Sequence, residues 1–263
     1  ANAPVEGPNG PCGPCSEIFY DHGAEYGCGA PGCSVACNCD RYVEIWNLVF
    51  MQYERREGGE LVPLPQKNID TGMGFERMLA VLNGLKSNFD TELFAPLIAW
   101  VALAAGKEYQ PRTAEGVRMK RIADHSRAMA FVIADGVLPG NEGRNYVLRK
   151  IIRRAVRDGR ELGISRPFLR ELIPFTIDRM SGTYPELATH REKILEVVHH
   201  EEEKFGITLE QGMRILEAEL AELTELTERA KGSGKSAPVF PGKSAFALHD
   251  RHGFPIDLVE AVL

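Results

Sequence analysis

Asn-Ile-Asp-Thr-Gly-Met-Gly-Phe-Glu-Arg, residues 68–77, stands between a short apolar stretch at 61–64 and a helical apolar pattern at 75–84. This order predicts a short strand, a glycine-rich turn over 68–74 and a helix, and such an order is typical of nucleotide sites. The two glycines lack Cβ atoms and therefore let a ligand approach the backbone. An ordinary strand-to-helix turn with a surface arginine stays open as the alternative.

The segment before this stretch predicts a longer strand. Residues 42–53 are rich in β-branched and aromatic side chains. If they are extended, Glu44 and Trp46 face one side of the strand, and Asn47 and Val49 face the other. Polar groups among apolar neighbours need partners, which a magnesium ion, a nucleotide or an amino acid can supply. An edge strand with its polar residues in water is the alternative.

All six cysteines lie within the first 39 residues. This distribution argues against a secreted disulfide framework and favours a reduced, cytoplasmic setting. Cys12 and Cys15 precede an extended stretch, so they indicate a rigid turn rather than a redox motif. Residues 22–40 form a loop between two expected strands, at 18–20 and 42–53. Two interpretations stay open for the thiols of this loop, a tetrahedral structural zinc site or free surface thiols; these thiols belong to Cys28, Cys33, Cys37 and Cys39.

After a linker around 106–113 the sequence becomes helical. Apolar residues recur at helical spacing over 119–134, 146–156 and 168–180. Residues 191–230 predict one long amphipathic helix, or two helices broken near Gly206.

Charge is strongly segregated along the chain, whose net charge is -6. Residues 112–170 carry 14 basic and 6 acidic side chains, a net of +8, whereas residues 186–228 carry 4 basic and 12 acidic, a net of -8. The first segment can hold a polyanion and the second cannot. With 44% hydrophobic and 26% charged residues, the composition is that of a soluble globular protein. No apolar run reaches the ~20 residues that span a bilayer, so a membrane protein is not expected.

Taken in order, these stretches resemble the alanyl-tRNA synthetase family. The resemblance covers nearly the whole chain and is carried by residues 10–18, 44–53, 70–77, 122–127, 134–157 and 245–258. It implies an α+β fold, in which part of a class II antiparallel sheet with flanking helices is followed by a mainly helical tRNA-recognition domain. Residues 1–110 would be the C-terminal part of the aminoacylation domain, with motif 3 at 70–77, and residues 111–263 the helical domain.

The resemblance also implies a site for alanine. Asp70 would bind the alanine ammonium group and Asn47 would contact the amino acid. Val49 would bound the small side-chain pocket, and Gly72 would line it.

For the second substrate, ATP, the resemblance implies that Arg77 and Gly74 contact the nucleotide. Glu44 would be the acid linked to Mg²⁺. The reaction would be attack of a carboxylate on the α-phosphate of ATP, followed by acyl transfer to tRNA, without a covalent protein nucleophile.

The helical half would bind tRNA(Ala), and neither DNA nor a membrane is expected as a partner. Asn141 and Asp250 would read a G·U wobble pair in the shallow minor groove of the acceptor stem. Basic residues at helical spacing would contact phosphates; these are Arg149, Lys150, Arg153, Arg154 and Arg157.

The chain also departs from the family. Motif 1 and the motif 2 arginine should precede Ala1, and the editing and C-terminal domains should follow Leu263, so we expect a fragment that is inactive or weakly active alone. The cysteine loop is not a general family feature, and residues 249–255 read His-Asp-Arg-His-Gly-Phe-Pro where the family usually reads Tyr-Asp-Thr-Tyr-Gly-Phe-Pro. A non-catalytic module that binds acceptor stems, or a class II ligase for another small amino acid, remain alternatives.

Overall fold

The computed structural model of the protein describes residues 9–231, 239–252, 254 and 259. The chain divides into two compact units, residues 1–95 and 96–263. The first contains β1 (Gly10–Cys12), β2 (Cys15–Asp21), β3 (Tyr42–Arg55), β4 (Leu61–Met73) and α1 (Phe75–Leu82). The second contains most of α2 (Ala95–Ala105), then α3 (Ala114–Ala134), α4 (Gly143–Glu161), α5 (Leu169–Met180), α6 (Pro185–Thr189), α7 (Arg191–Lys231) and α8 (Gly242–His252). This combination confirms the predicted α+β class.

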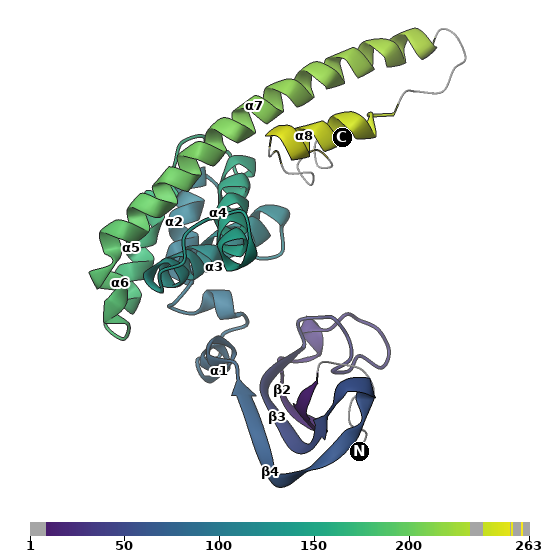
Figure 1. Ribbon diagram of the computed structural model, residues 1–263, viewed down its shortest axis with the longest axis vertical. Coiled ribbons are helices and arrows are strands. Elements are labelled where there is room, and N and C mark those ends of the chain that lie inside the picture. The colour runs from purple at the N-terminus through teal and green to yellow at the C-terminus, as the bar shows by residue number, and fades with distance from the viewer. Residues whose placement is uncertain (1–8, 232–238, 253, 255–258, 260–263) are drawn as a thin grey trace. The chain divides into compact units, whose positions relative to one another are not determined.

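The first unit is an antiparallel sheet built around β3 (Figure 1). β4 pairs along one edge of β3, while β2 and β1 pair in succession along the other. The turn that joins β1 to β2 lies directly against β3, where the Phe50 amide donates to the Pro14 carbonyl at 2.8 Å. A Cβ at Gly13 would lie 1.8 Å from the Phe50 carbonyl oxygen. Only glycine fits there, which explains one glycine of the Gly-Pro-Cys-Gly-Pro-Cys stretch.

The glycine-rich turn predicted over 68–74 is wrong. β4 continues through Met73, and only Gly74 stands between this strand and α1. Backbone pairing with β3 over residues 68–73 outweighs the local preference of Gly72 for turns, since a glycine is tolerated in a strand where neighbouring backbones pair.

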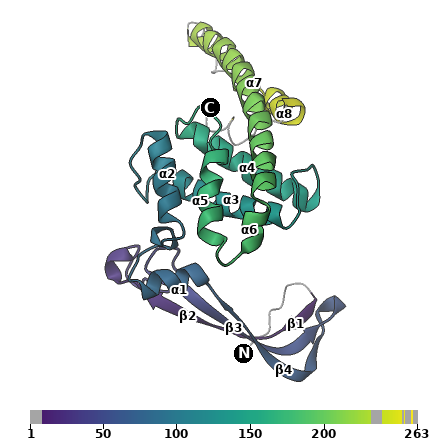
Figure 2. The same cartoon turned by 90° about the vertical axis from the view of Figure 1, so that its left-hand side faces the viewer.

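The second unit is a helical bundle (Figure 2). α3 packs against α4 and α5, and all three helices pack against α7. Their inward faces supply a core of fully buried side chains, which include Met119, Ile122, Ile133, Ile152 and Phe205. α8 lies against α7, where a Cβ at Gly212 would overlap the ring of the buried Phe254.

The four helices predicted from apolar spacing in this unit are confirmed. α3 begins earlier than predicted, α4 is longer at both ends, α5 begins one residue later and α7 ends one residue later. α7 runs unbroken through Gly206, so the two-helix alternative does not hold. α2 is not predicted from the sequence, because that helix is apolar on all sides and shows no helical alternation of polar residues. Among the described residues, no helix is both long enough and apolar enough to cross a membrane.

Candidate functional site on the antiparallel sheet

The register of β3 and β4 gathers the four residues predicted for an amino-acid site. Asn47 lies opposite Gly72, and Val49 lies opposite Asp70. Directly opposed residues of antiparallel strands point to the same face, as do residues two apart on one strand. Asn47, Val49, Asp70 and Gly72 therefore share one face of two neighbouring strands.

β2 adds a carboxylate that the sequence patterns do not single out. Glu17 lies opposite Asn47 on the other edge of β3. Its Oε1 accepts a hydrogen bond of 3.3 Å from Asn47 Nδ2, which orients the amide. The second amide atom, Asn47 Oδ1, is buried and has no hydrogen-bond partner among the described residues. An oriented acceptor without a partner is available to a donor from a ligand.

A β-bulge places Glu44 on this same face. In the pairing of β2 with β3, Ile18 lies opposite Trp46 but Phe19 lies opposite Glu44, so Ile45 is the extra residue. Phe19 and Ile18 point to opposite faces, and Glu44 therefore shares the face of Phe19, not that of Trp46. The strict alternation predicted for residues 44–49 is wrong at this point, because the bulge turns Glu44 towards the side that carries Asn47.

Arg77 and Gly74 are tied to the bulge. The Arg77 Nη1 donates to the Glu44 carbonyl oxygen at 2.8 Å and lies 3.9 Å from Glu44 Oε2. The Gly74 amide donates to the Ile45 carbonyl at 3.1 Å. These bonds fix the first turn of α1 beside β3. The Arg77 side chain stays 46% exposed, so a fixed guanidinium presents further N–H donors to solvent or to a ligand.

Together these groups form a polar, partly exposed patch with separated charges. The Asp70 side chain is exposed, and its carboxylate makes no hydrogen bond or ion pair with a described residue. A carboxylate and an amide oxygen can accept from an ammonium group, and the arginine can pair with a phosphate. Val49 and Gly72 between them add only a small apolar surface. The patch can therefore hold a small zwitterion next to an anion.

Several basic side chains of α4 are engaged in ion pairs within the protein, which their sequence pattern does not reveal. Arg153 Nε donates to Glu201 Oε1 at 2.8 Å, and Arg149 Nε lies 3.4 Å from the same oxygen. Arg157 lies 3.6 Å from Glu161. Lys150 and Arg154 are exposed and form no ion pair with a described residue, although Lys150 lies 5.5 Å from the centre of the Tyr146 ring. These two side chains are the accessible cations of the predicted set.

The proposed reader of the wobble pair, Asn141, lies in the turn before α4 and accepts a hydrogen bond from Arg149. Asp250 lies on α8, but its side chain falls outside the described part of the structure. Their predicted pairing stays a prediction.

A cavity of about 440 Å³ opens beside this turn. Its lining brings Arg149 together with Lys193, His200 and Lys204 of α7, and it also contains the acidic side chains of Glu196 and Glu201. The three basic side chains of α7 lie in the segment of net charge -8, for which polyanion binding was not expected. Their spacing of seven and four residues gathers them on one side of the helix, and a segment average conceals such a face.

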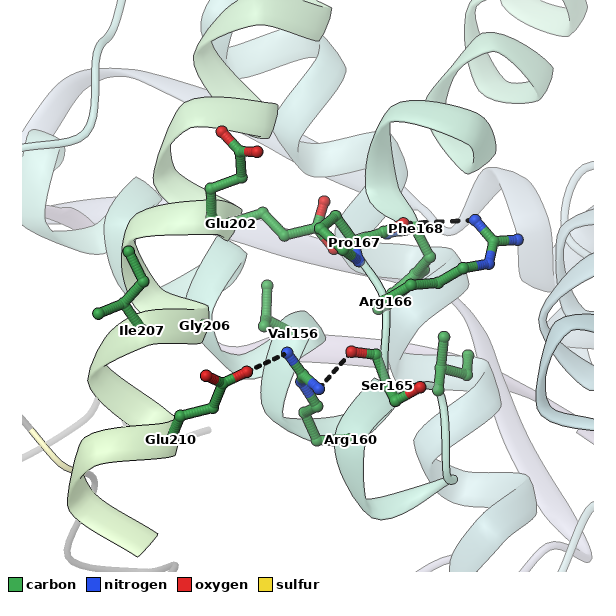
Figure 3. Close-up of a pocket in the computed structure, with 12 residues that line it drawn as sticks. Val156, Arg160, Ser165, Arg166, Pro167, Phe168, Glu202, Gly206, Ile207 and Glu210 are labelled. Atoms are coloured by element: carbon green, nitrogen blue, oxygen red, sulfur yellow. Dashed lines mark hydrogen bonds and ion pairs between the residues drawn. The ribbon is translucent and has the colours of Figure 1, made fainter. Parts of the chain in front are cut away.

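A second cavity, of about 420 Å³, lies between α7 and the start of α5. Figure 3 shows Arg160 reaching both Ser165 and Glu210 across it. The buried Glu202 accepts hydrogen bonds from the Phe168 amide at 2.8 Å and the Leu169 amide at 3.1 Å. Burial raises the pKa of Glu202 to about 7. This carboxylate of α7 caps the N-terminus of α5, so the residues around the cavity connect these two helices and have a structural role.

The cysteine loop brings sulfur atoms together. The Sγ atoms of Cys28, Cys33 and Cys37 lie within 4.8 Å of one another, and Cys33 Sγ lies 3.7 Å from Cys39 Sγ. The Ser34 amide points at Cys37 Sγ and lowers the pKa of that thiol. Cys12 and Cys15 lie apart from this cluster, on β1 and β2.

The sequence is similar to proteins of one known family. The sequence model described as tRNA synthetases class II (A) matches residues 2–263. The chain is 49% identical over 257 residues to the alanine–tRNA ligase of Desulfosudis oleivorans, covering 98% of this chain. It is 48% identical to the alanine–tRNA ligases of Lawsonia intracellularis and Desulfitobacterium hafniense, over 97% and 98% of this chain. The chain spans 28% of the length of each of these relatives. It belongs to the class II (A) tRNA synthetase family.

Proposed function

We propose that this chain is part of a cytoplasmic alanine–tRNA ligase, which activates alanine with ATP and transfers it to the 3′ end of tRNA(Ala). The observation that carries the proposal is the single sheet face shared by Asp70, Asn47, Val49 and Gly72, with Arg77 fixed beside it. The identity of 48–49% to alanine–tRNA ligases supports the choice of alanine.

In this proposal the amino acid lies across β3 and β4. Asp70 pairs with the ammonium group, and Asn47 Oδ1, oriented by Glu17, accepts a second N–H. The methyl group lies between Val49 and Gly72, where a longer side chain would meet the Val49 side chain or the β4 backbone. Discrimination by pocket size alone is worth roughly 1–3 kcal/mol per methylene.

The two reaction steps then require the protein to position the substrates, and no side chain has to form a covalent bond with them. The alanine carboxylate oxygen attacks the α-phosphorus of ATP, the bond to the bridging oxygen breaks, and pyrophosphate leaves. A terminal ribose hydroxyl of tRNA next attacks the carbonyl carbon, loses its proton, and AMP leaves. Arg77 pairs with nucleotide charge, and Gly74 lets the nucleotide approach the backbone. Holding both reactants in line supplies most of such rate enhancements.

Glu44 fits the role of the acid linked to Mg²⁺. Arg77 hydrogen-bonds the Glu44 carbonyl rather than its carboxylate, which stays 3.9 Å away. Magnesium favours one or two carboxylates together with phosphate oxygens and water. When bound with ATP, the ion would neutralise phosphate charge.

For tRNA binding we propose that Lys150 and Arg154 contact acceptor-stem phosphates directly, since both are exposed. Arg149, Arg153 and Arg157 contribute positive potential. Arg149 and Arg153 reach a phosphate only by leaving Glu201, and Arg157 only by leaving Asp158 and Glu161. Asn141 and Asp250 read the G·U pair.

Amino-acid-dependent exchange of pyrophosphate into ATP tests the activation step. The protein that carries this chain should exchange with alanine and far more weakly with glycine and serine. Strong exchange with another amino acid favours the alternative ligase. Tight acceptor-stem binding with no exchange favours the non-catalytic module. Residues 1–263 alone should exchange weakly or not at all.

Stem variants test the recognition step. Asn141→Ala should erase most of the preference for a G·U over a G·C stem, at a cost near the ~1–3 kcal/mol of a base contact. Affinity and charging rate must both be measured. A preference that survives Asn141→Ala combined with Asp250→Ala removes this pair from recognition.

A further inference from the structure

The loop between β2 and β3, residues 22–40, has no apolar core of its own. His22 is its single buried residue, and a one-turn 3-10 helix at Ala24–Tyr26 is its single regular element. The base of the loop is closed by Asp21, which accepts two hydrogen bonds of 2.9 Å from Arg41. Burial of apolar surface cannot hold the remainder of so small a segment, so another kind of crosslink is needed.

Thiols occupy the part of the loop that lacks a core. Cys28, Cys33 and Cys37 have their Sγ atoms within 4.8 Å of one another. Cys39 Sγ lies 3.7 Å from Cys33 Sγ but outside that group of three, so a fourth ligand at this position requires it to move closer to Cys28 or Cys37. Four sulfurs at about 2.3 Å from a tetrahedral zinc ion are about 3.8 Å apart. The Cys33–Cys39 separation matches that edge, whereas a disulfide requires about 2.05 Å.

The backbone of the loop also suits thiolate ligands. Cys33 and Cys37 each close a tight turn. The Cys33 amide donates a hydrogen bond to the Ala30 carbonyl at 3.1 Å, and the Cys37 amide donates one to the Ser34 carbonyl at 2.9 Å. The Ser34 amide lies 3.5 Å from Cys37 Sγ and can donate to it. Backbone donors to sulfur stabilise a thiolate and orient it, as outer ligands do in metal sites.

We propose that residues 28–39 form a structural Zn²⁺ site with Cys28, Cys33, Cys37 and Cys39 as its four ligands. Four thiolates close the tetrahedron, so the site holds the loop rather than performing catalysis. Each thiol that binds as a thiolate releases its proton to solvent. The inference stands on the loop geometry and is independent of the proposed function.

Metal content tests the site directly. The chain, purified under reducing conditions without chelator, should contain one zinc per molecule by mass spectrometry of the metal. Cobalt substituted for zinc should give the visible absorption of a tetrahedral thiolate site. Cys37→Ser should lose the metal or change the cobalt spectrum, and Cys39→Ser should do the same.

A matched control comes from the two cysteines outside the cluster. Cys12→Ser combined with Cys15→Ser should keep the full zinc content and the unchanged cobalt spectrum. Loss of metal in this control, with retention in Cys37→Ser, would assign the ion to β1 and β2 and overturn the proposal. So would a metal-free chain that still takes up no zinc, a Cys33–Cys39 disulfide in reducing buffer, or iron with sulfide in place of zinc.

Hydrogen exchange keeps the test decisive if a serine variant does not fold. Removing zinc from the wild-type chain with a chelator should speed amide exchange in residues 22–40 and leave β3 and β4 unchanged. Equal exchange with and without bound metal would contradict a structural role.

Discussion

Arg77 donates a hydrogen bond to the backbone carbonyl of Glu44 at 2.8 Å, across 33 residues of sequence. The acceptor belongs to the bulge in β3, and the donor belongs to the first turn of α1. This bond fixes the position of the guanidinium, while the Glu44 carboxylate makes only a 3.9 Å ion pair with the same nitrogen. The bulge, the strand that bears Asp70 and the helix that bears Arg77 are therefore one positioned unit.

Glu17 should act as a positioning residue for Asn47. Glu17→Ala removes the acceptor of Asn47 Nδ2, so the amide loses its orientation and the KM for alanine should rise several-fold. Glu17→Gln keeps an acceptor oxygen and should restore most of the affinity. Pyrophosphate exchange measured against alanine concentration checks this, with the KM for ATP as the internal control. An equal change in both KM values would indicate general damage to the sheet.

Lys150 and Arg154 should carry salt-dependent tRNA binding. Replacing either with Ala should weaken binding to G·U and G·C stems alike, and flatten the log–log salt dependence by up to about 0.9 for each phosphate that is no longer neutralised, a DNA-calibrated value. Arg170→Ala, an exposed arginine on α5, is the control. Fluorescence anisotropy over a range of salt concentrations gives the slope. If the salt-dependence slope changed in Arg170→Ala but not in the Lys150 and Arg154 variants, the tRNA phosphates would not contact this face of α4.

Part of the antiparallel sheet could be predicted from sequence, because strand propensity depends on neighbouring residues. β1 and the second half of β4 were not predicted as strands. Strand propensity marks residues 42–53, and the motif at 70–77 marks the residues of the site. The position of Glu44 could not be predicted, since the bulge exists only in the pairing with β2. Glu17 was missed for the same reason, as its partner is 30 residues away.

The helical half shows the complementary difficulty. Helical periodicity located α3, α4, α5 and α7, but it carried no information on which charges meet between helices. Glu201 of α7, which is 4% exposed, forms ion pairs with Arg149 and Arg153, so these two arginines are not freely available to a ligand. Such a pair depends on the packing of α4 against α7, which the separate patterns do not encode.

Glu202 should make stability depend on pH. Its folded-state pKa of about 7 lies above the ordinary 4.5, so the folded chain binds this proton more tightly than the unfolded chain does. The stabilising contribution is complete below pH 4.5 and is lost as pH rises through 7, by roughly 3 kcal/mol in total. Glu202→Gln keeps an acceptor for the Phe168 amide and should remove this part of the dependence.

Urea unfolding between pH 4.5 and 8 measures this effect as a difference between wild type and variant. Glu217→Gln, at an exposed position on α7, should follow wild type. Parallel pH profiles for wild type and Glu202→Gln would show that folding does not shift the pKa of Glu202.

Asp70 should bind the substrate ammonium group, so alanine-dependent pyrophosphate exchange should depend on its carboxylate. The measurement is this exchange by Asp70→Asn in the full-length protein. Losing a hydrogen bond to a charged group costs roughly 1.5–3 kcal/mol, so kcat/KM for alanine should fall roughly 10- to 150-fold with unchanged thermal stability. Glu60→Gln, in the exposed turn before β4, should exchange like wild type. Exchange by Asp70→Asn within twofold of wild type would contradict the account, because no ammonium could then depend on that carboxylate.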